Sequence, residues 1–113
     1  MYEYKATYIK NYDGDTITFK IDLGFHVSIT ENIRVARIDT PELRGDEREK
    51  GLEVKRFVYE EMEYADKIII RTNKDKTGKY GRYIAEVIYY KDNIEINLSD
   101  LLLKEGMAEP YGG

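Results

Sequence analysis

The sequence contains no cysteine and a single histidine, His26. The lack of cysteine excludes disulfide bonds and thiolate ligands, and one histidine is too few for a zinc site built on nitrogen and sulfur. Any metal ion that this chain binds must therefore be held by oxygen atoms.

Long apolar runs are missing too. No stretch of about 18 apolar residues is present that could span a bilayer, and 42% apolar against 35% charged residues is typical of a soluble globular protein. The length of 113 residues suits one domain with a real core and leaves no room for a second, so we expect a single domain over residues 1–113. We also expect a monomer that does not enter a membrane.

A secretory signal is not expected in these residues. The chain starts with Met1 followed by Tyr-Glu-Tyr-Lys, which is neither a basic segment nor an apolar one. The protein would be cytoplasmic if this sequence is complete, and secreted or attached to the surface if an export segment was removed.

An excess of basic residues is absent as well. The formal net charge is −4, whereas binding of nucleic acid through counterion release needs clustered lysine and arginine. The acidic excess lies in residues 46–66, so the rest of the chain is nearer to neutral and can still present a basic cleft. Affinity for nucleic acid would have to be local.

The hydrophobic pattern predicts strands in the first forty residues. Residues 16–23 alternate between apolar and polar side chains, which is the period of a half-buried strand, with one face formed by Ile17, Phe19, Ile21 and Leu23. Strands are also predicted at residues 2–10 and at about 26–38.

The period then becomes helical. Apolar side chains recur three and four positions apart in about residues 46–64, which predicts an amphipathic helix. Strands are predicted again at residues 67–72 and 83–90, and Asn97 or Ser99 can cap a short final helix that ends at Gly106. The fold class is therefore α+β, mainly β: a five-stranded Greek-key OB-fold barrel with a helix between strands 3 and 4 and a short C-terminal helix.

The segment Asp13-Gly14-Asp15-Thr16 can be read in two ways. Asp-Gly is a common hairpin turn, which would explain Asp13 and Gly14 by structure alone. Asp15, however, has the parity of Ile17 and so points toward the core side, where a carboxylate is costly unless it is paired or bound to a cation.

The segment from Arg34 to Glu42 also has two readings. Pro41 stops a regular strand, so Asp39 and Thr40 lie at a strand end where a carboxylate and a backbone carbonyl can converge on one ion. Arg34 and Asp39 have opposite parity, so a shared site requires a bulge or sharp bend between them. The alternative is a plain turn that leads to the helix, with Arg34 on an exposed strand face.

The third segment, Lys79-Tyr80-Gly81-Arg82, is by default a solvated turn. Its functional reading uses Arg82 as a planar fork for phosphate, Lys79 as a point charge and Tyr80 as a stacking surface. Only the joint occurrence of the three segments favours a functional site.

At these segments the chain resembles the staphylococcal nuclease (thermonuclease) family, whose pattern has a D-G-D-T turn, an R-x4-D-T-P-E segment and a Y-G-R turn. Here the same motifs occur in the same order, with the predicted helix in the expected interval. The resemblance extends from about residue 6 to residue 111. It implies an OB-fold nuclease that hydrolyses single-stranded and double-stranded DNA and RNA, depends on Ca²⁺ and has little sequence specificity.

The resemblance also implies roles for individual residues. Ca²⁺ would be held by Asp15, Asp39 and the backbone oxygen of Thr40, while Glu42 would orient or deprotonate the attacking water. The remaining roles would fall to residues that contact the substrate: Arg34 and Arg82 for the phosphate in catalysis, Lys79 and Tyr80 for a neighbouring phosphate, and Tyr111 for packing of a nucleotide.

Two alternatives remain at this point. The chain could be a non-catalytic OB-fold module that binds single-stranded nucleic acid or a protein partner, although such modules lose the acidic and arginine residues that are present here. It could also be a structural calcium-binding domain, which has no use for the arginines. Residues 43–51 are shorter than the basic loop of the family and mixed in charge. Together with the acidic net charge of the chain, this predicts weaker or more salt-sensitive DNA binding than that of basic family members.

Overall fold

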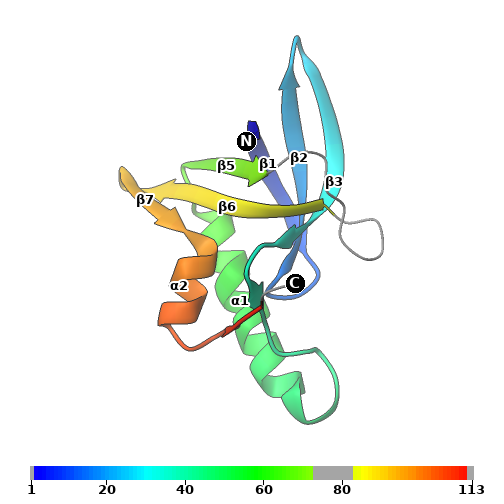
Figure 1. The fold of residues 1–113 in the computed structure, drawn as a ribbon, viewed down its shortest axis with the longest axis vertical. Helices are drawn as coiled ribbons and strands as arrows, with labels where there is room; N and C mark the ends of the chain where they lie inside the picture. Colours follow the sequence, from blue (N-terminus) through cyan, green and yellow to red (C-terminus); the bar gives the residue numbers. More distant parts are fainter. Residues whose placement is uncertain (1, 73–82, 112–113) are drawn as a thin grey trace.

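Five strands form a closed barrel in the computed structural model, which describes residues 2–72 and 83–111 (Figure 1). The barrel strands are β1 (Tyr2–Asn11), β2 (Thr16–Gly24), β3 (Val27–Val35), β5 (Lys67–Thr72) and β6 (Tyr83–Lys91). β1 pairs antiparallel with β2 and β5, β2 with β3, and β5 with β6; the parallel pair β3–β6 closes the barrel. This topology confirms the predicted OB-fold.

The other elements flank the barrel or, like β7 (Ile94–Asn97) beside β6, extend its sheet. A 3₁₀ turn, η1 (Gly45–Glu47), leads into α1 (Arg48–Glu63), and β7 leads into α2 (Leu98–Lys104). Two short strands, β4 (Ile38–Asp39) and β8 (Glu109–Pro110), pair antiparallel beside the barrel. No helix in the described part of the chain combines the length and the apolar character needed to cross a membrane.

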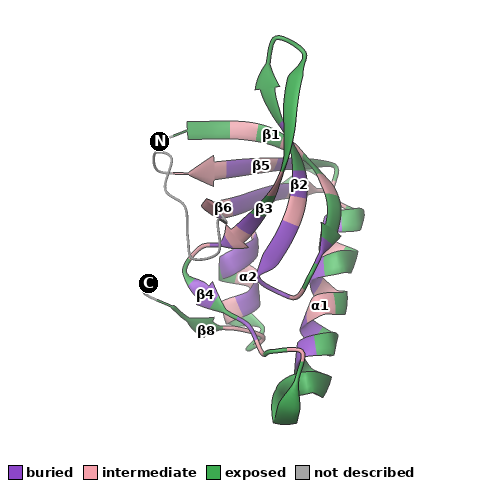
Figure 2. Cartoon of the chain, turned by 90° about the vertical axis from the view of Figure 1, so that its right-hand side faces the viewer, coloured by how far each residue is buried: buried purple, intermediate pink, exposed green. Residues whose placement is uncertain are grey.

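The core lies between the barrel and α1. The alternating side chains Ile17, Phe19 and Ile21 of β2 are buried, as their period predicts. α1 turns one stripe toward them, visible as its buried positions in Figure 2, and this stripe consists of Gly51, Val54, Val58 and Met62. The spacing of three and four residues keeps these positions on one face of the helix.

The third predicted strand is too long at both ends. It was expected over about residues 26–38, whereas β3 begins at Val27 and ends at Val35. His26 lies in the β2–β3 turn with a φ of 64°, and Arg37 has a φ of 70°, which interrupts the strand before β4. The positive φ of Arg37 is the sharp bend that a site shared by Arg34 and Asp39 requires.

The other helices and strands have bounds close to those predicted, but one strand was not predicted. β5 has the predicted bounds, the Asn97 side chain caps α2 by accepting from the Asp100 amide at 3.2 Å, and Gly106 follows that helix with a φ of 70°. β7 was not predicted. Its signal was the Asp92-Asn93 pair, where both residues have positive φ, as a two-residue hairpin turn requires.

Two phenylalanines of β2 and the turn that follows it give a direct test of the core. Phe19 is 0% exposed and Phe25 is 97% exposed at the tip of the β2–β3 hairpin. Phe19→Ala should lower the free energy of unfolding by about 3–5 kcal/mol, because it removes buried surface and leaves a cavity. Phe25→Ala should change it by less than about 0.5 kcal/mol. Urea unfolding of both variants checks this, and equal effects would contradict the described packing.

Candidate active site

The loop between β1 and β2 is a compact turn built by Asp13. Its Oδ1 accepts the amide hydrogens of Asp15 at 3.0 Å and of Thr16 at 2.9 Å. The carbonyl of Asp15 accepts the Val35 amide at 2.8 Å, which ties this turn to the end of β3. The turn reading of Asp13-Gly14 is therefore confirmed, and the same turn fixes where Asp15 lies.

The carboxylate of Asp15 connects three segments of the chain. Asp15 is only 6% exposed. Its Oδ2 accepts the buried amide hydrogen of Thr40 at 3.0 Å and lies 3.5 Å from Nη2 of Arg34. Its Oδ1 is 3.4 Å from the hydroxyl of Thr16. The first two of the three predicted segments therefore meet at one carboxylate.

Arg34 lies on the outer face of β3, because its neighbours Ile33 and Val35 are in the core. Its Nη2 also lies 3.5 Å from Oδ1 of Asp39, and its Nη1 donates to the Val35 carbonyl at 2.9 Å. The guanidinium carbon is 5.4 Å from the centre of the Tyr111 ring, a cation–π distance. The structure thus brings Asp15, Arg34, Asp39, Thr40 and Tyr111 together.

The bend that brings Asp39 back to Arg34 is anchored by Arg37. Its guanidinium donates to Glu86 of β6 at 2.8 Å and to Asp100 of α2 at 2.9 Å. The Ser99 hydroxyl donates to the Ala36 carbonyl at 2.6 Å. These contacts hold a non-glycine residue at positive φ, which costs free energy unless its surroundings fix it.

The charges at the site are unbalanced. Burial, together with the neighbouring charge of Asp15, raises the pKa of Asp13 to about 6. Burial and then the charge of Asp15 also raise the pKa of Asp39, although Arg34 opposes this. Asp15 and Asp39 therefore share one guanidinium, that of Arg34, and the acid of Asp13 adds negative charge beside Asp15, so a bound cation would lower the electrostatic free energy of the site.

The donors present suit a hard cation. Thr40 has a buried hydroxyl oxygen with no hydrogen-bond partner among the described residues, and the backbone amide of the same residue donates to Asp15. No three acidic or histidine side chains of the described part come close enough to enclose a metal by themselves. Backbone oxygen and water would have to complete the coordination, which Ca²⁺ accepts in its flexible geometry.

Two glycines let α1 and the site segments approach closely. A Cβ on Gly51 would overlap the carbonyl of Glu42 and lie 3.0 Å from that of Pro41. A Cβ on Gly14 would lie 2.6 Å from Val54 and 2.9 Å from Thr40. Sequence reasoning did not select Gly51, although a glycine inside a helical pattern indicates such a contact.

Glu42 makes no hydrogen bond to the described residues of the cluster, although burial and then nearby carboxylates, Glu42 among them, raise the pKa of Asp39. Its carboxylate accepts from Nε of Arg44 at 3.0 Å, its amide donates to Glu47, and its side chain is 61% exposed. No hydrogen bond joins it to Asp15 or Arg34 within the described ranges. Lys79, Tyr80 and Arg82 fall in residues 73–82, outside the residues that the structure describes.

Comparison with known proteins adds two findings. The family model "Staphylococcal nuclease homologue" matches residues 32–112, which is more than half of the chain. The chain is also 28% identical over 128 aligned residues to the uncharacterized protein MJ1439 of Methanocaldococcus jannaschii, with 96% of this chain and 59% of that protein covered. The chain thus spans less than two thirds of that relative.

Gly51→Ala should destabilise the protein although alanine favours helices by about 1 kcal/mol. The added methyl group must push the Pro41–Glu42 backbone off α1, and we expect a loss of about 1–3 kcal/mol in the free energy of unfolding. Glu53→Ala, an exposed change in the same helix, is the control and should stay within about 0.5 kcal/mol. Urea unfolding measures the stability of both variants. A Gly51→Ala variant that is more stable than wild type would contradict the close approach of α1 to the Pro41–Glu42 backbone.

Glu86 should make stability depend on acid pH. The hydrogen bond from Arg37 lowers the pKa of Glu86 below the ordinary value of a glutamate. A lowered pKa stabilises the fold above the unfolded pKa, and this stabilisation is lost as the pH falls through the folded pKa. Glu86→Gln should therefore be less stable than wild type at pH 7 and approach it at low pH. Denaturant unfolding at several pH values checks this, and a difference independent of pH would refute the assignment.

Proposed function

The chain belongs to the staphylococcal nuclease homologue family, and on that basis we propose that it is a calcium-dependent phosphodiesterase. Its substrates are DNA and RNA, single-stranded or double-stranded, and it cleaves the 5′ P–O bond with little sequence specificity. The observation that carries this proposal is the Asp15 carboxylate, which lies between the Thr40 amide and the Arg34 guanidinium. An oxygen site for a cation and a phosphate-binding arginine thereby adjoin each other.

The metal ligands in this proposal are Asp15, Asp39 and the backbone oxygen of Thr40. Ca²⁺, when bound there, supplies positive charge that polarises a phosphoryl oxygen and offsets the charge that develops on phosphorus. A cavity of about 310 Å³ is lined by Asp39 and Thr40, two of the three proposed ligand residues, but not by Asp15.

Arg34 binds the scissile phosphate. Its contacts with Asp15 and Asp39 are both 3.5 Å, longer than the 2.7–2.9 Å typical of a strong charged hydrogen bond. The guanidinium can therefore turn donors toward phosphate oxygens. Arg82 is proposed as its partner on the transition state, where two arginines neutralise the equatorial charge.

Glu42 orients or deprotonates the attacking water. The water oxygen forms a bond to phosphorus in line with the 5′-oxygen, which leaves with the electron pair of the broken P–O bond while the water proton passes to Glu42. An exposed ion pair such as that between Glu42 and Arg44 is worth only about 0–1 kcal/mol. The carboxylate can therefore leave Arg44 and turn toward the substrate at small cost.

Substrate contacts beyond the scissile phosphate are proposed for Tyr111, Lys79 and Tyr80. Tyr111 already packs on Arg34, so its ring can pack on a nucleotide whose phosphate Arg34 holds. The protein acts as a monomer, with one cluster per chain.

A non-catalytic nucleic-acid-binding module is the second candidate. The placement of Glu42 favours it, because the proposed water-orienting carboxylate is engaged with Arg44 and not with the cluster. Binding of phosphate needs Arg34 but does not need Glu42.

Digestion of single-stranded and double-stranded DNA with Ca²⁺, Mg²⁺ or EDTA separates the two candidates. We expect cleavage with Ca²⁺ and none with EDTA. Glu42→Gln and Arg82→Ala should each lower kcat by about 10²- to 10³-fold, because each removes a group that acts in the transition state.

Glu60→Gln is the matched control for Glu42→Gln. Glu60 is also an exposed carboxylate paired with an arginine, Arg56, but it lies on α1. Its variant should cleave like wild type. If wild type shows no calcium-dependent cleavage from neutral to alkaline pH, the nuclease proposal fails and the binding module remains.

A further inference from the structure

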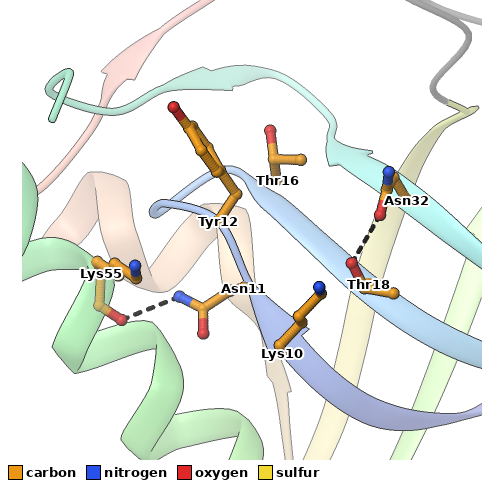
Figure 3. Close-up of a pocket in the computed structure, with 7 residues that line it drawn as sticks. All are labelled: Lys10, Asn11, Tyr12, Thr16, Thr18, Asn32 and Lys55. Carbon is orange, nitrogen blue, oxygen red and sulfur yellow. Dashed lines mark hydrogen bonds between the residues drawn. The ribbon is translucent and has the colours of Figure 1, made fainter.

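A second polar cavity lies on the outer face of the barrel, next to the candidate active site but outside it (Figure 3). It forms where the end of β1 and the neighbouring parts of β2 and β3 meet α1, and its volume is about 570 Å³. This volume is in the range of pockets that hold small organic ligands.

Positive charge dominates this cavity. Lys10 of β1 and Lys55 of α1 line it, and none of its lining residues is acidic. Neither ammonium group forms an ion pair with a carboxylate of the described residues, and Lys55 is half-buried. Two unpaired lysines in one cavity of a protein with net charge −4 indicate an anionic ligand.

The other polar groups of the cavity are held in place. The Thr18 hydroxyl donates to the Asn32 side chain at 2.6 Å across the β2–β3 pair, a contact drawn in Figure 3. The buried Asn11 amide donates to the carbonyls of Asp13 and Lys55, each at 3.0 Å. β1, the turn and α1 are thereby fixed around the two lysines.

The cavity continues the surface on which Arg34 lies. Thr16, which lines the cavity, is the register partner of Arg34 in the β2–β3 pair. Asn32 precedes Arg34 by two residues and therefore lies on the same face of β3, about 7 Å away. A polynucleotide with one phosphate at Arg34 can therefore extend over this cavity.

We propose that this cavity is a phosphate subsite for a single-stranded polynucleotide, in which Lys10 and Lys55 bind a phosphodiester next to the one held by Arg34. Tyr12 is 69% exposed beside it and offers a ring face on which a base can stack. The proposal deepens the proposed function and rests on it for the strand path through Arg34. The subsite supplies local affinity that the net charge of the chain does not.

Oligonucleotide binding in EDTA tests the subsite without cleavage. The probes are fluorescent oligothymidylates of eight and of two residues. Their binding is measured by anisotropy from low to moderate salt. The double variant Lys10→Gln/Lys55→Gln should bind the octamer about tenfold more weakly, and its plot of log K against log salt should be shallower by about 0.7, the contribution of the one single-strand phosphate contact that is lost.

Two control variants and a thermal scan separate the effect of the lysine charges from other effects of the substitutions. Lys104→Gln removes one exposed lysine at the end of α2 and should bind the octamer like wild type. Lys10→Arg/Lys55→Arg keeps both charges and should restore most of the affinity. Asn11 uses only the backbone carbonyl of Lys55, so the variants should melt like wild type, and a thermal scan verifies this.

The outcomes are separable from those of the cleavage assay. Wild-type affinity and salt slope in Lys10→Gln/Lys55→Gln would overturn the subsite even if calcium-dependent cleavage is found. Inorganic phosphate that binds as tightly as the octamer at constant ionic strength would show a site for the free anion and would also overturn the proposal. Loss of octamer affinity in the double variant without any cleavage by wild type would support the subsite and reject the nuclease.

Discussion

The buried carboxylate of Asp15 is the interaction on which the site depends. It accepts the Thr40 amide at 3.0 Å and lies 3.5 Å from the Arg34 guanidinium, while the backbone of the same residue accepts the Val35 amide at 2.8 Å. A buried carboxylate is costly unless it is paired, so the fold must bring these partners to it. The start of β2, the end of β3 and β4 consequently meet at one rim of the barrel.

The supporting structure serves both stability and the site. Gly51 and Gly14 let α1 pack directly on the segments that carry Glu42 and Thr40. The helix that packs against the barrel core therefore also holds these segments in place. Arg37, at positive φ, turns the chain between Arg34 and Asp39, and its bonds to Glu86 and Asp100 link that turn to β6 and α2. A change in the core would therefore alter the site.

The sequence pattern predicted those structural features that depend only on residues near one another in the chain. The alternation of residues 16–23 predicted the buried face of β2, and the parity of Asp15 predicted a carboxylate that needs a partner. Opposite parity likewise predicted a bend before Asp39. What could not be predicted depends on which side chains meet in three dimensions: Arg37 contacts Asp100, Glu42 pairs with Arg44 instead of the cluster, and Lys10 and Lys55 line one cavity.

Ca²⁺ titration followed by NMR tests the central role of Asp15 most directly. In wild type, Ca²⁺ should shift the amide signals of Asp15, Asp39 and Thr40. Asp15→Asn keeps an oxygen that can accept the Thr40 amide but loses the charge, and it should weaken Ca²⁺ binding by about tenfold or more. Asp22→Asn, on β2 and exposed, should not weaken it. Equal Ca²⁺ affinity in Asp15→Asn and wild type would contradict the account.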